Sequence, residues 1–269
     1  MAKKQKLIQR LIEMGACQTE KEAAARIMAG EVYINGQKAA NGAMVKEDQE
    51  VTLKGVLPYA SKGGFKMAGA LEDFGIDVQG RICIDAGACT GGFTDCLVQR
   101  DAALVYAVDV GFGQLMGKLR QNPHVVNLEK TNISDEKLLT LDPRPDFGTV
   151  DVSYLSLRKA IPYFSAVLHG AGELCCLVKP LFEIDDAEAR RTGVIADEQY
   201  APLLFDLIRD VNSMPGTAVK AITHSHVTGN AGTREFFLHV CLGTACPPIP
   251  DEAIYAAVER AKELELYKK

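Results

Sequence analysis

The feature that most restricts the fold of this chain is a regular alternation of short apolar runs with helical segments between residues 82 and 178. Runs rich in Val, Ile, Leu and Phe predict strands at residues 82–86, 104–110, 125–128, 147–152 and 174–178. Helices are predicted between them at residues 91–100, 113–121, 134–140 and 155–168. Such an alternation favours an α/β fold with a mostly parallel sheet and helices on both faces.

The C-terminal part of the chain departs from this alternation. A helix predicted at residues 198–213 precedes two β-rich stretches, residues 218–224 and 234–242, which a Gly-rich turn joins. We therefore expect an antiparallel pair at one end of the sheet. A last helix is predicted at residues 251–267.

A small α+β module is predicted in front of the sheet domain. Its helices are expected at residues 6–14 and after Thr19, which opens a capping box. Its strands are expected at residues 31–38, entering an Asn-Gly turn, and at residues 45–53. Gly and Pro in residues 54–58 break helix and strand, which predicts a linker and two domains, 1–58 and 59–269.

Charge also separates the two parts. Residues 1–58 carry nine Lys and Arg against seven Asp and Glu, whereas the remainder carries 21 against 28. The whole chain has a formal charge of −5, which argues against a simple non-specific nucleic-acid binder. A module of opposite sign suggests that residues 1–58 have a partner of their own.

Composition excludes several classes of protein. With 47% apolar and 24% charged residues, the chain has the balance of a soluble globular protein rather than a disordered one. No apolar run approaches the length of a membrane span and no secretion signal is expected, so we predict a cytoplasmic protein. The eight cysteines form no Cys-x-x-Cys pair, and we expect buried reduced thiols rather than a zinc site or disulfides.

The first predicted strand ends in a Gly-rich turn, Asp85-Ala-Gly-Ala-Cys-Thr-Gly-Gly-Phe-Thr94. Such a turn between a strand and a helix lets a nucleotide-like ligand approach the backbone and the helix N-terminus. It is neither a G-x-G-x-x-G fingerprint nor a phosphate loop. Asp109, at the end of the second strand, stands where an acid would accept hydrogen bonds from ribose hydroxyls.

Three further segments carry unusual polar residues: 61–66, 151–157 and 177–183. Lys179 follows a predicted strand, as Asp151 does, so both are expected at the same edge of the sheet. A Lys beside an Asp at that edge favours a functional pair, with solvated surface charge as the alternative.

The N-terminal module resembles the alpha-L RNA-binding motif, named for a small-subunit ribosomal protein, through the run Arg26-Ile-Met-Ala-Gly-Glu-Val-Tyr-Ile-Asn-Gly36. The resemblance implies that basic side chains contact structured RNA; they are Arg10, Lys21, Arg26 and Lys38. The usual Arg-Leu-Asp opening of that motif is replaced here by Lys6-Leu7-Ile8.

Over essentially its whole length the chain resembles the TlyA family, through the ordered motifs D-A-G-A-C-T-G-G-F-T-D, A-V-D-V-G-F-G-Q-L, D-V-S-Y-L-S-L and V-K-P-L-F-E. Its members, often called haemolysins, are S-adenosylmethionine-dependent ribose 2′-O-methyltransferases of ribosomal RNA. The resemblance implies a Rossmann-like class I methyltransferase domain, S-adenosylmethionine as cofactor, and a cytidine ribose in ribosomal RNA or a ribosomal subunit as substrate. It implies no metal and no membrane partner.

The resemblance to the related FtsJ-type enzymes implies a catalytic tetrad, which is Lys66, Asp151, Lys179 and Glu235. The residues that it implies for the cofactor are Asp85, Gly87, Thr90, Gly91, Gly92, Phe93, Asp109, Asn132 and Ile133. Lys62 joins the residues expected to contact RNA. The chain departs from the family pattern at Lys62, Ser134, Leu181 and Thr233, all near the RNA or cofactor side.

The expected reaction transfers a methyl group to a ribose 2′-hydroxyl, with Lys179 as the general base that Asp151 orients. Glu235 is expected to pair with Lys66 and to steer the ribose. One alternative is an RNA-binding protein that retains the fold without catalysis, which the departures at Lys62, Ser134 and Thr233 leave open. Another, a membrane-active haemolysin, lacks support because no secretion signal, membrane span or long basic amphipathic helix is expected.

Overall fold

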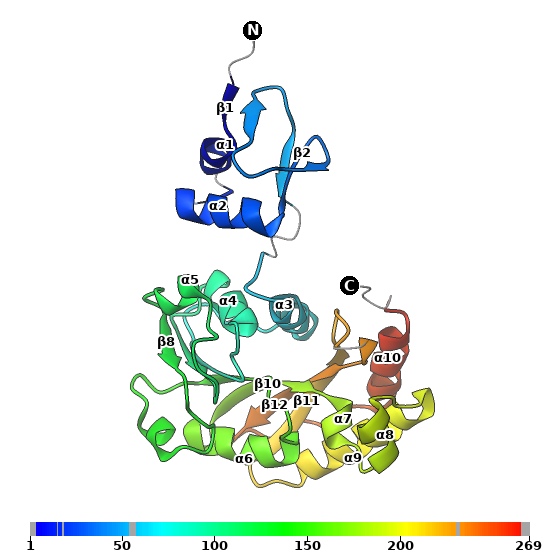
Figure 1. Cartoon of the computed structure of the whole chain (residues 1–269). Coiled ribbons are helices and arrows are strands. Elements are labelled where there is room, and N and C mark those ends of the chain that lie inside the picture. Colours follow the sequence, from blue (N-terminus) through cyan, green and yellow to red (C-terminus); the bar gives the residue numbers. More distant parts are fainter. Residues whose placement is uncertain (1–3, 15, 18, 54–57, 230–231, 265–269) are drawn as a thin grey trace. The chain divides into compact units, whose positions relative to one another are not determined.

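The computed structural model describes residues 4–14, 16–17, 19–53, 58–229 and 232–264 (Figure 1). The chain divides into two compact units, Met1–Pro58 and Tyr59–Lys269. The predicted linker residues 54–57 lie outside the described residues, as do residues 265–267 of the predicted last helix.

The first unit packs two helices and two small sheets around one apolar core. The helices are α1 (Leu7–Glu13) and α2 (Glu20–Ala29), and α2 begins directly after Thr19, as predicted. The strands are β1 (Lys4–Lys6), β2 (Val32–Ile34), β3 (Gln37–Lys38), β4 (Met44–Lys46) and β5 (Val51–Leu53). Strand β1 pairs with β4, and the second sheet has the order β3-β2-β5. The buried side chains are Leu7, Leu11, Cys17, Ala23, Ile27, Val32, Val45 and Val51.

Two details of the first unit differ from the prediction. Residues 45–53 form two strands rather than one, because a turn in which Gln49 N donates to Lys46 O separates β4 from β5. Strand β1 was not predicted, since its polar residues Lys4, Gln5 and Lys6 carry no apolar pattern. The Asn-Gly turn is confirmed: Asn35 and Gly36 have φ of 49° and 77°, as a tight hairpin requires.

The second unit is built on a seven-stranded sheet of order β11-β12-β10-β9-β6-β7-β8 (Figure 1). The strands are β6 (Ile82–Ala86), β7 (Leu104–Val108), β8 (Val125–Leu128), β9 (Phe147–Val150), β10 (Gly172–Val178), β11 (Thr217–His224) and β12 (Phe236–Leu242). The pairs among β6 to β10 are parallel, and β12 runs antiparallel between β10 and β11. The predicted parallel sheet with an antiparallel pair at one end is thus confirmed.

Helices cover both faces of this sheet. They are α3 (Gly63–Phe74), α4 (Gly92–Gln99), α5 (Gly117–Arg120), α6 (Leu157–Val167), α7 (Pro180–Glu183), α8 (Ala187–Thr192), α9 (Tyr200–Asn212) and α10 (Asp251–Lys262), with 3₁₀ turns at Glu136–Thr140 and Asp197–Gln199. Figure 1 shows α3 and α4 on one face and α6 and α9 on the other. None of the helices described combines the length and apolar character that crossing a membrane requires.

Helix α3 was missed by the sequence analysis because glycines at positions 63, 64 and 69 weaken the helical pattern. Close packing explains why two of these positions are glycine. A Cβ at Gly64 would lie 2.2 Å from the Tyr59 side chain, and one at Gly69 would lie 2.6 Å from the His226 ring. The helix therefore needs glycine where neighbouring rings lie against its backbone.

Neighbouring residues of the central strands face two separate cores. Cys83 packs with α3 and α4, whereas Ile84 packs with α6 and α9, and Cys175 and Cys176 divide in the same way. Six of the eight cysteines are buried, and all eight are free thiols, as expected. The expectation of burial is wrong for Cys89, which is exposed in the Gly-rich turn, and for Cys246, which is partly exposed.

Candidate active site

A cavity of about 590 Å³ opens at the carboxyl ends of β6, β9 and β10. The chain proceeds outward from β6 to β7 and β8 on one side and from β9 to β10 on the other, so the cavity lies at the topological switch point of the sheet. All four predicted tetrad residues line it, together with Lys62, Gly87, Thr90, Gly92 and Phe93. Gly91, Asp85, Asp109, Asn132 and Ile133 are not among its lining residues.

The Gly-rich turn after β6 fits closely against the end of β9. Gly87 has φ of +86°, and a Cβ there would lie 2.1 Å from the backbone oxygen of Asp151. Asp151 N in turn donates to Ala86 O at 2.9 Å. Gly91, with φ of +96°, precedes the first turn of α4. These contacts fix the position of the turn at the border of the cavity.

Asp85 lies beneath the turn rather than in the cavity. Its side chain is completely buried, and it accepts hydrogen bonds from Thr94 Oγ1 at 2.6 Å and Thr149 Oγ1 at 2.9 Å. Burial raises the pKa of Asp85 to about 6, although these two hydrogen bonds favour the ionised form. Asp85 can therefore hold the turn in place. The resemblance implied that Asp85 contacts the cofactor, but its carboxylate does not border the cavity.

Asp109 holds two neighbouring loops at the end of β7. Its carboxylate accepts from Cys89 N at 2.8 Å and from Gly111 N at 2.6 Å. The backbone of Thr131 donates to Asp109 O at 2.9 Å, which brings the segment with Asn132 and Ile133 beside it. Asn132 is exposed, whereas Ile133 is buried in the core below.

The tetrad residues come from four separate segments and form two ion pairs. Lys66 of α3 pairs with Glu235, which precedes β12. Lys179 follows β10, and its Nζ lies 2.5 Å from Asp151 Oδ1, in an ion contact that lacks hydrogen-bond geometry. Lys179 Nζ also donates to Ser153 Oγ at 3.2 Å. Parallel strands that end at one edge explain why Asp151 and Lys179 meet.

The two pairs differ in their exposure to solvent. The Lys66 and Glu235 side chains are 12% and 7% exposed, and those of Lys179 and Asp151 are 20% and 25% exposed. Burial raises the pKa of Glu235, although the Lys66 charge opposes this change. The more open Lys179–Asp151 pair is the better placed to meet a substrate that enters the cavity.

Glu183 joins the two segments that carry Asp151 and Lys179. Its buried carboxylate accepts from Ser156 Oγ at 2.6 Å and from Leu157 N at 2.7 Å, and it pairs with Arg158 at 2.9 Å. Burial raises the pKa of Glu183 above its usual value despite these partners. The carboxylate thereby ties the start of α6 to α7, which directly follows Lys179.

Several residues that line the cavity were not predicted from the sequence. Tyr154 and Phe182 line it with ring centroids 5.2 Å apart, and Tyr154 is 91% exposed with φ of +64°. Arg234 lines it too, pairing with Asp197 and lying 5.5 Å over the Tyr200 ring. Tyr154 and Phe182 lie within the motifs quoted above and Arg234 directly precedes Glu235, so aromatic and basic residues beside the tetrad positions were the available signal.

The four basic residues of the first unit that are expected to contact RNA differ in their exposure to solvent. Lys21 and Lys38 are exposed, whereas Arg10 and Arg26 are partly buried. Arg26 pairs with Glu31 at 3.4 Å, near the end of α2. The Lys38 side chain lies over Gly30, where a Cβ would come 1.7 Å from Lys38 Cε. Lys38 is therefore brought to the same end of α2 as Arg26.

The chain is similar to known proteins over most of its length. Residues 59–242 match the model of the FtsJ-like methyltransferase family. The chain is 35% identical over 242 residues to the 16S/23S rRNA (cytidine-2′-O)-methyltransferase TlyA of Mycobacterium tuberculosis, covering 88% of this chain and 90% of that one. It is 37% identical over 229 residues to Hemolysin A of Brachyspira hyodysenteriae, covering 84% and 95%. A solved structure of a candidate hemolysin from Streptococcus thermophilus has a TM-score of 0.72 at 32% identity, covering 98% and 97%.

Proposed function

Because the chain belongs to the FtsJ-like methyltransferase family, we propose that it transfers a methyl group from S-adenosylmethionine to the 2′-hydroxyl of a cytidine ribose in ribosomal RNA. The relative from M. tuberculosis is named for that substrate, and the present chain covers 90% of its length. With this substrate the enzyme would act in the cytoplasm, on ribosomal RNA or on a ribosomal subunit.

The observation that carries the proposal is the meeting of two Lys–carboxylate pairs in one cavity beside the Gly-rich turn. Lys66, Asp151, Lys179 and Glu235 come from positions up to 169 residues apart, yet all line the same 590 Å³ space. A volume of this size is typical of small-molecule and cofactor sites. Structural ion pairs alone would not require such a cavity.

The residues around the cavity fit the cofactor chemically. Asp109 does not line the cavity, but its carboxylate is bonded to Cys89 of the turn that does, and from there it would accept hydrogen bonds from the ribose hydroxyls of the cofactor. The glycines at 87 and 92 leave the backbone of the turn free of side chains. The carboxylates of Asp151 and Glu235 offset the charges of Lys179 and Lys66, so these two pairs add no net charge that would repel a cationic ligand. When bound, S-adenosylmethionine supplies the electrophilic methyl group.

Lys179 is the proposed general base. A ribose hydroxyl is a weak nucleophile, so its proton must be removed as it attacks, and only the neutral amine of Lys179 can accept that proton. Asp151, 2.5 Å from Nζ, orients the amine and stabilises the ammonium that forms. The buried Lys66–Glu235 pair, which lines the same cavity, is proposed to position the ribose.

The first unit is proposed to bind ribosomal RNA. Its net charge is positive, and Arg10, Lys21, Arg26 and Lys38 offer cationic groups for phosphates. Lys62, which lines the cavity of the second unit, would contact the RNA segment that carries the target. This division assigns substrate binding to one unit and chemistry to the other.

Methyl transfer onto ribosomal RNA tests the proposal directly. The purified protein would be incubated with S-adenosylmethionine and either free ribosomal RNA or ribosomal subunits, and the product digested and analysed by mass spectrometry. We expect one methylated ribose at a cytidine, seen as a bond that resists alkaline cleavage. Methylation of a base, or none on any ribosomal substrate when the cofactor is bound, would contradict the proposal and favour a non-catalytic RNA-binding protein.

A further inference from the structure

Away from the active site, we propose that Asp73, His224 and His226 bind one zinc ion that joins α3 to the β11–β12 pair. None of the three residues lines the methyl-transfer cavity. The proposal therefore goes beyond the proposed function and does not depend on it. No metal site was expected from the sequence, because the resemblance implies none and the cysteine spacing fits none.

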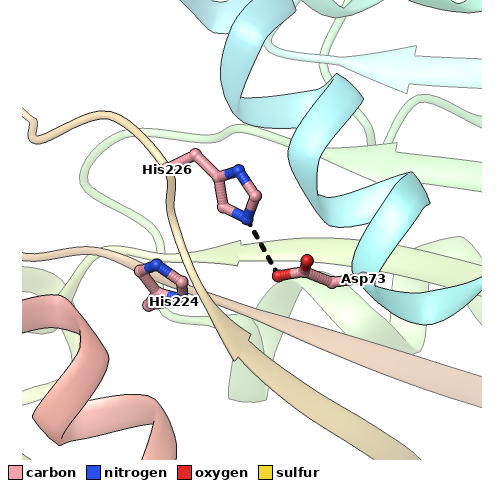
Figure 2. A group of neighbouring side chains, drawn as sticks. All are labelled: Asp73, His224 and His226. Carbon is pink, nitrogen blue, oxygen red and sulfur yellow. Dashed lines mark hydrogen bonds and ion pairs between the residues drawn. The ribbon is translucent and has the colours of Figure 1, made fainter.

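The three side chains converge from separate segments, as Figure 2 shows. Asp73 lies in the last turn of α3, His224 ends β11, and His226 follows two residues later. One ligand atom from each lies within 4.8 Å of the others, and His226 Nε2 is 3.0 Å from Asp73 Oδ2. Tetrahedral zinc with bonds of about 2.0–2.2 Å separates its ligand atoms by about 3.4 Å. Modest side-chain rotations would reach that geometry.

An unpaired ring nitrogen points to a missing partner. His224 Nδ1 is buried and makes no hydrogen bond with any of the residues that the structure describes. A buried polar atom without a partner is destabilising. One ring nitrogen of His224 is thus free to coordinate a metal without breaking an existing bond.

The surroundings hold the other two side chains in place. Thr223 Oγ1 donates to Asp73 Oδ2 at 2.5 Å, as outer partners of metal-binding carboxylates commonly do. The His226 ring lies directly over Gly69, where a Cβ would come within 2.6 Å of it. The His224 and His226 rings stack with centroids 5.0 Å apart. Asp73 and His226 are exposed, but these contacts from α3 and from the end of β11 restrict their side chains.

The ligand types favour zinc over the other common divalent ions. Two imidazoles and one carboxylate suit a borderline metal, whereas Mg²⁺ and Ca²⁺ prefer oxygen ligands throughout. Three protein ligands leave a fourth position for water. Arg260 of α10 and Glu263, which directly follows α10, act on His224 with opposite charges, so Glu263 offsets part of the repulsion that Arg260 exerts on a cation.

The position of the site gives it a structural role. Lys66 and Asp73 are seven residues apart on α3, which places them two turns apart on the same face of the helix. On the other side, Ser225, between the two histidines, donates its N–H to Glu235 O at 2.8 Å. An ion at this site would therefore tie the segment that carries Lys66 to the segment that carries Glu235.

Zinc binding to the full-length protein tests the site. The protein would be freed of metal with a chelator and titrated with ZnCl₂ against a chromophoric competitor, and its melting temperature followed in parallel. We expect one high-affinity zinc per chain and a rise in melting temperature. His226→Ala and Asp73→Asn should each weaken affinity by at least about tenfold and abolish the rise. His169→Ala, an exposed histidine bonded to Leu139 O, should change neither.

Cobalt distinguishes this site from the cysteines. Co²⁺ bound to nitrogen and oxygen ligands gives visible bands without the intense near-ultraviolet thiolate transition. The His226 side chain is 39% exposed, so its removal should leave the fold intact, which the far-ultraviolet circular dichroism would verify. Unchanged zinc affinity in folded His226→Ala or Asp73→Asn protein, or a thiolate transition in the wild type, would overturn the proposal.

Discussion

Gly87 and the backbone carbonyl of Asp151 approach so closely that a Cβ on residue 87 would lie 2.1 Å from Asp151 O. The turn proposed to border the cofactor and the strand end that carries the orienting carboxylate are thus in direct backbone contact. No flexible side chain can yield here, because the Cβ is attached directly to the backbone of residue 87 and its neighbour is a main-chain oxygen. Any displacement of the turn would move Asp151 and with it the ion pair to Lys179.

Gly87→Ala should therefore damage both the fold and the site. The positive φ alone costs an alanine about 1 kcal/mol, and forced displacement of the backbone adds about 1–3 kcal/mol. Gly80→Ala is the matched control, since Gly80 has φ of +71° with nothing within 4 Å. Urea unfolding should show the larger loss for Gly87→Ala, and titration calorimetry a weaker binding of S-adenosylhomocysteine. Equal losses in the two variants would mean that the contact with Asp151 is easily relieved.

Lys179→Ala should abolish most methyl transfer while leaving cofactor and RNA binding nearly unchanged. Loss of a general base typically lowers the rate by about 10²–10⁴-fold. Lys179→Arg should not restore the rate, because a guanidinium keeps its proton and cannot act as a base. Single-turnover assays of the wild type and both variants measure these effects.

The arginine variant separates a base from a fixed positive charge. If Lys179→Arg transferred methyl groups at a nearly normal rate, Lys179 would act only through its charge. A proper comparison needs the cofactor affinity of each variant, so that a loss of binding is not mistaken for a loss of chemistry.

Asp85 should make stability depend on pH in the acidic range. Its pKa is raised from 3.8 to about 6 by burial, so the folded chain holds this proton more tightly than the unfolded chain. Its contribution to stability is therefore largest below pH 4 and is lost as the pH rises to about 6, by about 3 kcal/mol. Asp85→Asn lacks this titration. Urea unfolding of both proteins at pH 4 and pH 7 should show the wild type losing more stability than the variant, and parallel changes would contradict the prediction.

Neutralising the basic residues of the first unit should weaken RNA binding without affecting the cofactor. In the triple variant Arg10→Gln, Lys21→Gln and Lys38→Gln, we expect lower affinity for ribosomal RNA and a smaller salt dependence, by about one unit of slope per lost phosphate contact. Lys46→Gln, at an exposed lysine of β4 that is not expected to contact RNA, is the control. Filter binding at several salt concentrations measures both quantities. An equal effect of the control variant would show only a loss of general charge.

Local sequence patterns were sufficient to predict most elements of the second unit. The apolar run from Ile82 to Ala86 followed by a Gly-rich turn predicted β6 and α4, and the structure has both within about one residue. Repeated strand-helix units leave few topologies, because parallel strands must be joined by crossovers that pack on the sheet. The positions of Asp151 and Lys179 at strand ends followed from the same reasoning.

Contacts between residues that no local pattern relates depend on the tertiary structure. The pairing of Glu235 with Lys66, 169 positions apart, was expected only from the resemblance to a family, and the meeting of His226 with Asp73, 153 positions apart, was not expected at all. Both occur because α3 lies against the end of β11. Helix α3 itself depends on this packing, since Gly64 and Gly69 weaken its intrinsic tendency and accept the Tyr59 and His226 rings instead. Likewise, the motif singled out Asp85 as a residue of the site. Its complete burial and its hydrogen bonds to Thr94 and Thr149 could not be predicted, because those two residues lie on neighbouring elements. Periodicity and turn chemistry act over a few residues, whereas burial and ion pairing depend on which elements the folded sheet brings together.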